Sequence, residues 1–223
     1  MTEQILSMED TNDTSHKMTY EDYLRLPEDG RLVEWVNEEA IYHLPVKPIH
    51  QEIVIFLTTL LATFSNFFGR GKVLSAPVEL RCHPNGNSRE PDIMFIRSEN
   101  LEHISENRME GAPDLIIEVV SNESVARDYD DKFIEYQECG VSEYWIIDPR
   151  PRRKRALFYQ LGDDGEYIPV TPVGGIYTSR AVPGFWFKVA WLWEQPDPLL
   201  TALEIAGFGE QAEILRQKKQ SSG

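Results

Sequence analysis

Residues 113–121 read P-D-L-I-I-E-V-V-S, and the interpretation of the whole chain starts from this stretch. Its run of β-branched and apolar residues between a proline and a serine predicts a strand that is buried on both faces. One acid, Glu118, lies near the end of the run. A carboxylate buried alone is so unfavourable that it normally takes up a proton instead. Glu118 therefore needs a cation, a metal ion or the open mouth of a cleft beside it.

Two candidate partners of Glu118 lie nearby in the sequence. Asp92 begins a second apolar run of strand type, within residues 89–96, which read R-E-P-D-I-M-F-I. Lys132 lies in the helix-like stretch that follows Glu118. Two acids on adjacent strands with one lysine beside them are suited to bind a divalent ion and a phosphate group.

The composition narrows the classes of function. The chain has 223 residues, and its 22 lysine and arginine residues against 37 aspartate and glutamate residues give a net charge of −15. This charge argues against a broad basic face for nucleic acid, although a local basic groove remains possible. The hydrophobic share of 41% can support a full core, and the length fits one domain with at most a modest appendage.

Three absences set the expected compartment. Cys82 and Cys139 lie far apart and form no C-x-x-C pair, which favours a reducing compartment over a disulfide framework and gives no sign of a zinc site. No basic start followed by an apolar core indicates a signal peptide. No run of about 18 apolar residues indicates a membrane span. We therefore expect a cytoplasmic protein without a membrane partner.

The order of the expected elements predicts an α/β fold in which helices flank a mixed sheet. The most secure element is a helix that ends at Gly69, because apolar residues recur at helical spacing over residues 53–68. Further helices are expected after a cap at Thr19, over 122–139 and over 199–219. Strands are expected at 72–81, 93–96, 113–121, 143–148, 156–160 and 167–173, with a hairpin over 31–42.

The connections between these strands follow from their spacing. Strands 72–81 and 93–96 are expected to pair as a hairpin, and residues 98–111 to form a polar connection with at most a helical turn. The series from strand 113–121 through a helix to strand 143–148 implies a parallel crossover.

Side-chain periodicity brings Glu118 and Lys132 toward each other. Alternation along a strand puts Glu118 on the same face as Ile116 and Val120. Lys132 lies among aromatic residues on the inner face of its helix, and its long stem can reach the sheet. An ion pair between Lys132 and Asp128, four residues earlier, is the structural alternative and stays open.

These residues carry a resemblance to a known group of proteins. Pro91-Asp92, the acid at 118 and Lys132 resemble the PD-(D/E)XK nuclease superfamily, although its usual E-x-K lysine position holds Val120 here. More closely, residues 111–124 and 131–149 resemble the Uma-two family of restriction-endonuclease-like proteins. The early segments 32–39 and 48–51 and the tripeptide Pro183-Gly184-Phe185 also fit that family.

The resemblance implies a restriction-endonuclease-like fold over residues 18–198, between a mobile tail, 1–17, and a closing helix and tail, 199–223. It also implies metal-dependent hydrolysis of phosphodiester bonds in DNA. Asp92 and Glu118, with the carbonyl of Val119, would hold Mg²⁺ or Mn²⁺, and Lys132 would orient the water or stabilise the transition state. Glu34 is a further catalytic candidate, with a solvated hairpin acid as its alternative.

The expected partners are DNA as the substrate and a second copy of the chain. The family resemblance, the closing helix and the aromatic segment with Trp186, Phe187, Trp191 and Trp193 suggest a homodimer. A two-fold assembly would also suit cutting both strands of a duplex. Two other functions stay open: an idle nuclease-fold module for binding or assembly, which the net charge favours, and a small-molecule or RNA phosphodiesterase. Secondary candidates, each with a structural alternative, are His50, Glu79, Glu90, Gln137 and the basic run 150–155.

Overall fold

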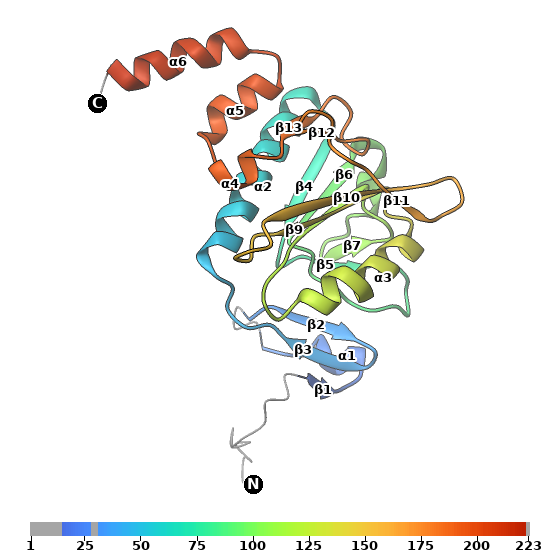
Figure 1. Ribbon diagram of the computed structural model, residues 1–223. Coiled ribbons are helices and arrows are strands. Elements are labelled where there is room, and N and C mark those ends of the chain that lie inside the picture. The colour runs from blue at the N-terminus through green and yellow to red at the C-terminus, as the bar shows by residue number, and fades with distance from the viewer. Residues whose placement is uncertain (1–14, 28–30, 222–223) are drawn as a thin grey trace.

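The stretch around Glu118 forms β8 (Leu115–Val119), an inner strand of a six-stranded mixed sheet (Figure 1). The computed structural model describes residues 15–27 and 31–221. β8 runs parallel to β9, and the other neighbouring strands of the sheet are antiparallel. In spatial order the strands are β11 (Tyr167–Pro169), β10 (Arg155–Leu161), β9 (Glu143–Asp148), β8, β6 (Ile93–Arg97) and β4 (Gly71–Ser75). The predicted mixed sheet and the parallel step from β8 to β9 are confirmed.

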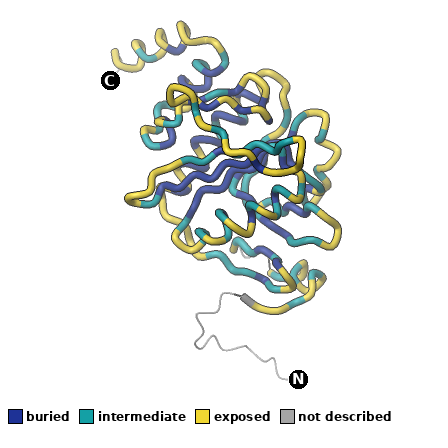
Figure 2. Tube along the Cα trace, turned by 45° about the vertical axis from the view of Figure 1, so that its right-hand side comes forward, coloured by how far each residue is buried: buried dark blue, intermediate teal, exposed yellow. Residues whose placement is uncertain are grey.

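Helices cover both faces of this sheet. α2 (Pro48–Phe68) begins with proline in its first turn and ends at Gly69, whose φ of 61° is left-handed, as its sequence predicts. α2 packs with Ile117 and Trp145 on one face, whereas α3 (Lys132–Cys139) packs with Ile116 and Tyr144 on the other. Alternate strand residues therefore feed two cores, which Figure 2 shows as buried strands inside more exposed helices. Glu118 belongs to the face that α3 covers.

The length and composition of α2 bear on the expected absence of a membrane span. α2 is long and apolar enough to cross a membrane. However, 44% of that apolar window is buried, and the inner side of the helix builds the larger core. The core helix of a folded protein can be equally long and apolar, so α2 gives only weak grounds for a membrane span.

The remaining elements lie around the sheet. The small sheet β1-β3-β2 lies with α1 at one end of the molecule, and α4 to α6 lie at the opposite end beside α2 (Figure 1). The strands are β1 (Ser15–Lys17), β2 (Val33–Val36), β3 (Glu39–Tyr42), β5 (Glu79–Arg81), β7 (Arg108–Glu110), β12 (Ile176–Thr178) and β13 (Trp186–Lys188). The helices are α1 (Tyr20–Tyr23), α4 (Trp191–Glu194), α5 (Pro198–Ile205) and α6 (Gly209–Ser221).

The expectations for the segments on either side of strand 93–96, which are 72–81 and 98–111, were wrong in part. The expected strand 72–81 divides at Pro77, which has no N–H to donate to a neighbouring strand, into β4 and β5. Only β4 pairs with β6, while β5 pairs in parallel with β7 in a separate two-stranded sheet. The stretch 98–111 holds the expected helical turn, as the 3-10 helix Ser98–His103, but it also holds the strand β7, which was not expected.

Helix boundaries and the N-terminal segment also differ from expectation. The helix expected over 122–139 contains a π-helical turn, Arg127–Asp131, before α3. The closing helix breaks at Gly207, whose φ is 88°, into α5 and α6. Of the tail expected to be mobile, residues 15–17 form β1 on β3, and residues 1–14 lie outside the described residues.

The two cysteines form a disulfide, which contradicts the expected free thiols. Their Cα atoms lie 5.4 Å apart although 57 residues separate them, because Cys82 follows β5 and Cys139 ends α3. No spacing pattern pairs two cysteines so distant in sequence. The bond ties the C-terminal end of α3 to the β5 region, and the cytoplasmic location stays a prediction.

Glu143, at the start of β9, fixes the C-terminal segment to the sheet. The side chain is fully buried. Its carboxylate accepts hydrogen bonds from Trp145 Nε1, Tyr177 OH, Ser179 Oγ and the backbone N–H groups of Arg180 and Ala181. Removing this acceptor leaves buried donors without a partner, which is among the costly changes in a protein interior.

We expect Glu143→Ala to lower the free energy of unfolding by about 3–5 kcal/mol. Urea titration measures this loss. Glu166→Ala is the matched control, because Glu166 is an exposed acid in the loop between β10 and β11, and its loss should stay within about 0.5 kcal/mol. Similar losses for both variants would contradict the role given to Glu143.

Candidate active site

Glu118 and Lys132 meet on the face of the sheet that α3 covers. Lys132 Nζ lies 2.8 Å from Glu118 Oε1, and the Tyr136 hydroxyl donates a hydrogen bond of 2.8 Å to the same oxygen. Both charged side chains are buried, with exposed fractions of 3% for Glu118 and 4% for Lys132. Strand alternation and the helix face predicted this contact, and the structure confirms it.

Asp92 joins the pair from the neighbouring strand. It directly precedes β6, and its Oδ2 accepts a hydrogen bond of 2.7 Å from the N–H of Val119. The same oxygen lies 3.2 Å from Nε2 of His50, which lies in the first turn of α2. Asp92, Glu118, Val119 and Lys132 line one cavity of about 610 Å³. The structure therefore brings the predicted metal-binding residues to one place.

Glu34 reaches the back of this site from β2 and is fully buried, so the alternative of a solvated hairpin acid is wrong. Its Oε1 lies 3.4 Å from Lys132 Nζ and accepts a hydrogen bond of 3.1 Å from the N–H of Glu90. Its Oε2 lies 3.2 Å from both Arg89 Nη1 and His43 Nε2. Glu34 is not among the residues that line the cavity, so it acts on the site through Lys132.

Asp128 is a further acid at the same lysine. It is buried, and its Oδ1 lies 3.7 Å from Lys132 Nζ. The Ser124 hydroxyl donates a hydrogen bond to Oδ2, whereas Oδ1 has no hydrogen-bond partner within the described part of the chain. The ion pair that was open as a structural alternative therefore exists, and it shares its lysine with Glu118 and Glu34.

Three carboxyl groups that line the cavity, those of Glu90, Glu118 and Asp128, have raised pKa values. Burial raises the pKa of Glu118; Lys132 opposes this shift, and the negative charges of Asp92 and Asp128 add to it. Burial likewise raises the pKa of Asp128 against the effect of Lys132. Burial and the charge of Glu34 raise the pKa of Glu90 to about 7. Such crowding of acids favours the binding of a further cation.

The groups behind the cavity have pKa values that keep them charged. Burial alone would lower the pKa of Lys132, but attraction by Glu118, Glu34 and Asp128 outweighs it and raises the value. Burial would raise the pKa of Glu34, but Lys132, His43 and Arg89 hold it well below its usual range. Lys132 therefore carries a stable positive charge among three buried carboxyl groups.

The structure separates the secondary candidates. His50 and Glu90 line the cavity. Gln137 does not, because its Oε1 accepts a hydrogen bond of 2.7 Å from the N–H of Tyr167. Glu79 lies elsewhere and accepts a hydrogen bond from the hydroxyl of Tyr20.

Sequence reasoning named Asp128 only as an alternative ion-pair partner of Lys132, from their spacing of four residues, and it did not place Arg89 or His43 in the site. Asp128 therefore carried a usable signal. Arg89 and His43 carried none, because they reach Glu34 only through the tertiary fold. Arg89 lies next to Ser88, which forms a backbone bridge with Trp35 beside Glu34.

The side-chain oxygen atoms of the cavity are candidate ligands for a divalent ion. Within residues 15–27 and 31–221, no three His, Cys, Asp or Glu side chains form a ready-made metal cluster. Mg²⁺ is usually bound through one or two carboxylates, with water and substrate phosphate in its other positions. Asp92 and Glu118 supply two such carboxylates in one cavity, and Oδ1 of Asp128, which accepts no hydrogen bond from the described residues, adds a third buried oxygen. These oxygen donors fit Mg²⁺ or Mn²⁺.

Comparisons with known proteins identify the family and the fold. Residues 20–190 match the Uma2 family, which is described as "Putative restriction endonuclease". Among solved structures, the crystal structure of a putative nuclease belonging to DUF820 from Anabaena variabilis matches with a TM-score of 0.63 at 15% sequence identity. The match covers 78% of this chain and 96% of the other. No curated protein matches the chain. At this identity the structural likeness establishes the fold.

Proposed function

Because the chain belongs to the Uma2 family of putative restriction endonucleases, we propose that it is a metal-dependent nuclease that hydrolyses phosphodiester bonds in DNA. The observation that carries this proposal is the meeting of Asp92, Glu118 and Lys132 at one cavity. Family membership and fold support a nuclease-like function. The substrate, the ion, a homodimer and a cytoplasmic location belong to the proposal.

Asp92 and Glu118 would hold Mg²⁺ or Mn²⁺, next to the backbone of Val119. When bound, the ion would lower the pKa of a water molecule and neutralise charge on the phosphate. His50 keeps Asp92 in place from α2, and Tyr136 keeps Glu118 in place from α3.

Lys132 supplies the positive charge of the site. Its ammonium group has three N–H donors, and its carboxylate neighbours hold it at the inner wall of the cavity. From there it can donate to a phosphate oxygen or orient a water molecule, and a fixed donor of this kind stabilises charge that develops in the transition state. Glu34 positions Lys132 from behind and is a positioning residue in this account.

The net charge of −15 favours one rival, a nuclease-fold module that binds or assembles without cutting. The separating experiment incubates the wild-type protein with supercoiled plasmid, single-stranded circular DNA and RNA, each with Mg²⁺, Mn²⁺ or EDTA. We expect nicked or linear DNA products with either ion and none in EDTA. Cleavage of RNA alone would favour the RNA phosphodiesterase. Intact substrates in every mixture would favour the idle module.

A further inference from the structure

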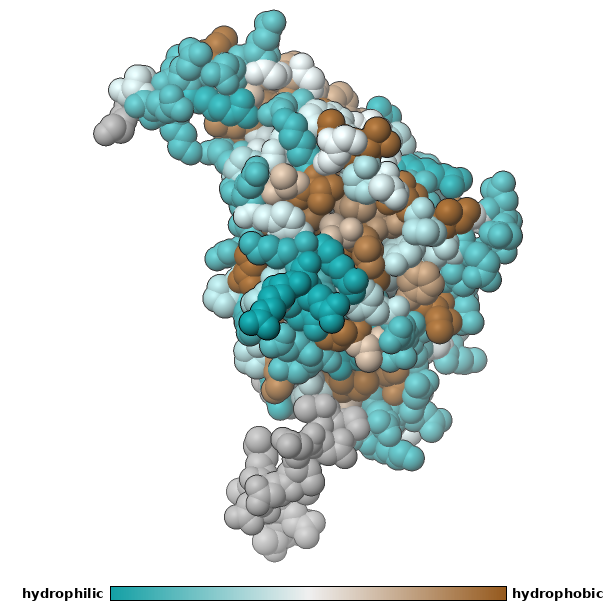
Figure 3. Space-filling model, in the orientation of Figure 1, coloured by the Kyte–Doolittle hydropathy of each residue, from teal (hydrophilic) through white to brown (hydrophobic). Residues whose placement is uncertain are grey.

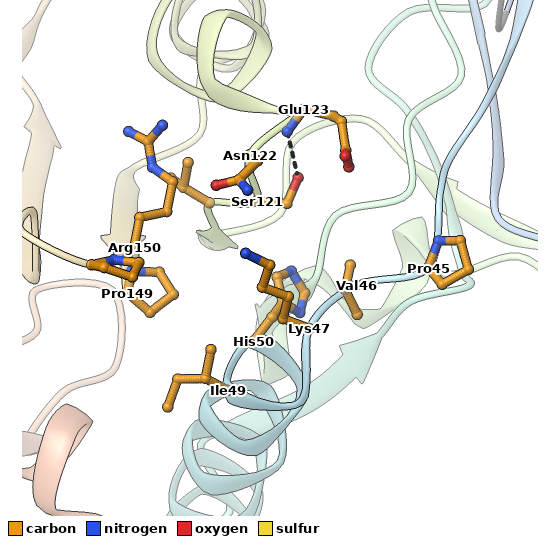
Figure 4. Close-up of a pocket in the computed structure, with 12 residues that line it drawn as sticks. Pro45, Val46, Lys47, Ile49, His50, Ser121, Asn122, Glu123, Pro149 and Arg150 are labelled. Carbon is orange, nitrogen blue, oxygen red and sulfur yellow. Dashed lines mark hydrogen bonds between the residues drawn. The ribbon is translucent and has the colours of Figure 1, made fainter.

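A second cavity, of about 70 Å³, adjoins the acidic one, and Figure 4 shows the residues that line it. The two cavities share four lining residues, which are Pro45, Val46, His50 and Ser121. The second cavity continues between the start of α2 and the turn after β9. Two basic residues, Lys47 and Arg150, and one acid, Glu123, line it, with Ile49, Val120, Asn122, Pro149 and Pro151 as the remaining wall. The shared residues make a continuous path from the acids to this turn.

The second cavity has apolar walls and polar groups at its mouth. Pro45, Ile49 and Pro149 supply apolar surface, and Lys47 extends toward Ser121 (Figure 4). Lys47 is exposed, and its ammonium group forms no ion pair with any residue of the described ranges. A surface of this kind suits a sugar or base against the walls and a phosphate at the lysine.

The path ends at the basic turn between β9 and β10, and Figure 3 shows a strongly hydrophilic patch over this turn. Arg150 is bound to Asp148, with Nη2 2.8 Å from Oδ2. Arg152, Arg153 and Lys154 are exposed, and in the described part of the chain their side chains make no ion pair. These three cations give the turn a local positive charge in a chain whose net charge is −15.

The backbone of the turn presents these cations outward. The N–H groups of Arg153 and Lys154 donate to the carbonyl oxygen of Arg150, at 3.0 and 3.3 Å. Arg152, with a φ of 69°, and Lys154, with a φ of 31°, adopt left-handed backbone conformations that residues other than glycine rarely take. A tight turn therefore carries charge at positions where glycine or asparagine would fit more easily.

We propose that one strand of DNA follows this path. The reacting phosphate lies at Asp92 and Glu118, the adjacent nucleotide lies across the second cavity with part of its sugar or base against the walls, and the phosphates beyond it contact Lys47 and the basic turn, 150–154. The acidic remainder of the surface repels DNA, so the path guides the strand to the site. This inference rests on the proposed nuclease function and adds the direction from which the substrate enters.

The burial of the acids favours a single strand over a duplex. Glu118 and Lys132 lie inside a cavity and are almost fully buried, so a reacting phosphate must enter it. A flexible single strand can bend into such a site while its other phosphates stay on the basic groups.

The test measures binding separately from cleavage. A fluorescein-labelled strand of about 15 nucleotides and its duplex are titrated with protein in EDTA, and anisotropy is followed over a series of salt concentrations. The test variant is Lys47→Gln/Arg153→Gln. The matched control, Arg70→Gln/Lys72→Gln, removes the same two residue types at the other end of α2, roughly 30 Å away. Cleavage of the same strand is then measured with Mg²⁺.

We expect the wild-type protein to bind the single strand more tightly than the duplex. The test variant should bind the single strand about tenfold more weakly at low salt, and the slope of log K against log salt should fall by about 1.4, since two phosphate contacts are lost. The control should match the wild type in both measures. The initial rate of cleavage at low DNA concentration should fall with the affinity.

Four results would overturn the path: no binding by the wild type, a preference for the duplex, equal losses in both variants, or unchanged binding in the test variant. If the wild type cleaves DNA while the test variant binds normally, the path fails and the nuclease function stands. If the losses are confined to the test variant and no protein cleaves, the path stands and the nuclease function fails.

Discussion

Replacement of Lys132 by methionine should destabilise the protein by roughly 3–5 kcal/mol, which is the range for removing one member of a buried ion pair. Methionine keeps the volume but removes the charge that Glu118, Glu34 and Asp128 share at 2.8, 3.4 and 3.7 Å. The three carboxyl groups are then left in a low-dielectric interior without compensation. Urea titration of the variant against the wild type measures the loss.

The loss of stability in Lys132→Met should depend on pH. Lys132 lowers the pKa of Glu118 and of Asp128 in the wild type, so its removal raises both values further. A carboxyl group whose pKa is raised by folding favours the folded state at low pH and loses that contribution as pH rises through the folded value. The difference between wild type and Lys132→Met should therefore grow from pH 5 to pH 8, as measured in about three buffers. A difference in unfolding free energy that is constant with pH would contradict the conclusion that these carboxyl groups share Lys132.

The substitution Asp92→Asn should remove the response of the protein to metal while keeping the fold. The charge of Asp92 raises the pKa of Glu118, so the neutral amide relieves repulsion and the metal-free variant should be at least as stable as the wild type. A bound ion stabilises the folded state by about 2.7 kcal/mol at a hundredfold excess over its dissociation constant. We expect Mg²⁺ or Mn²⁺ to raise the melting temperature of the wild type by roughly 5–10 °C and that of the variant not at all.

Calorimetry with and without EDTA measures these shifts. Glu123→Gln is a suitable control, because Glu123 is an exposed acid of the loop after β8 and keeps the metal-binding residues intact. A variant that is badly destabilised without metal, yet still shifted by metal, would make Asp92 a structural residue that only anchors the Val119 N–H and His50.

The sequence predicted elements whose signals are local. The helix that ends at Gly69 was predicted by its apolar spacing and its stop, since a long amphipathic face and a left-handed cap are encoded within one segment. The contact of Glu118 with Lys132 followed from strand alternation, a helix face and the short crossover between them. Local periodicity was sufficient in both cases because the partners belong to consecutive elements.

The features that were missed depend on contacts between distant segments. Glu34 is buried because β2 is bridged to the segment before β6, and nothing in the hairpin itself indicates that its acid meets Arg89 and Lys132. The Cys82–Cys139 bond joins two elements that only the tertiary fold brings together. In the same way, β5 does not pair in the predicted hairpin. It pairs with β7, a strand too short to show a sequence pattern. Pairing choices of this kind are made by the assembled fold.

The central claim is that Asp92 and Glu118 form the metal-binding site of a nuclease. A side-by-side cleavage assay of wild type and Asp92→Asn tests this claim most directly. Both proteins, with matching folded spectra, are incubated with supercoiled and single-stranded DNA in Mg²⁺, Mn²⁺ or EDTA. The account predicts cleavage by the wild type with either ion, none in EDTA, and a rate at least about 10³-fold lower for Asp92→Asn. Equal cleavage by the two proteins, or cleavage that continues in EDTA, would contradict it.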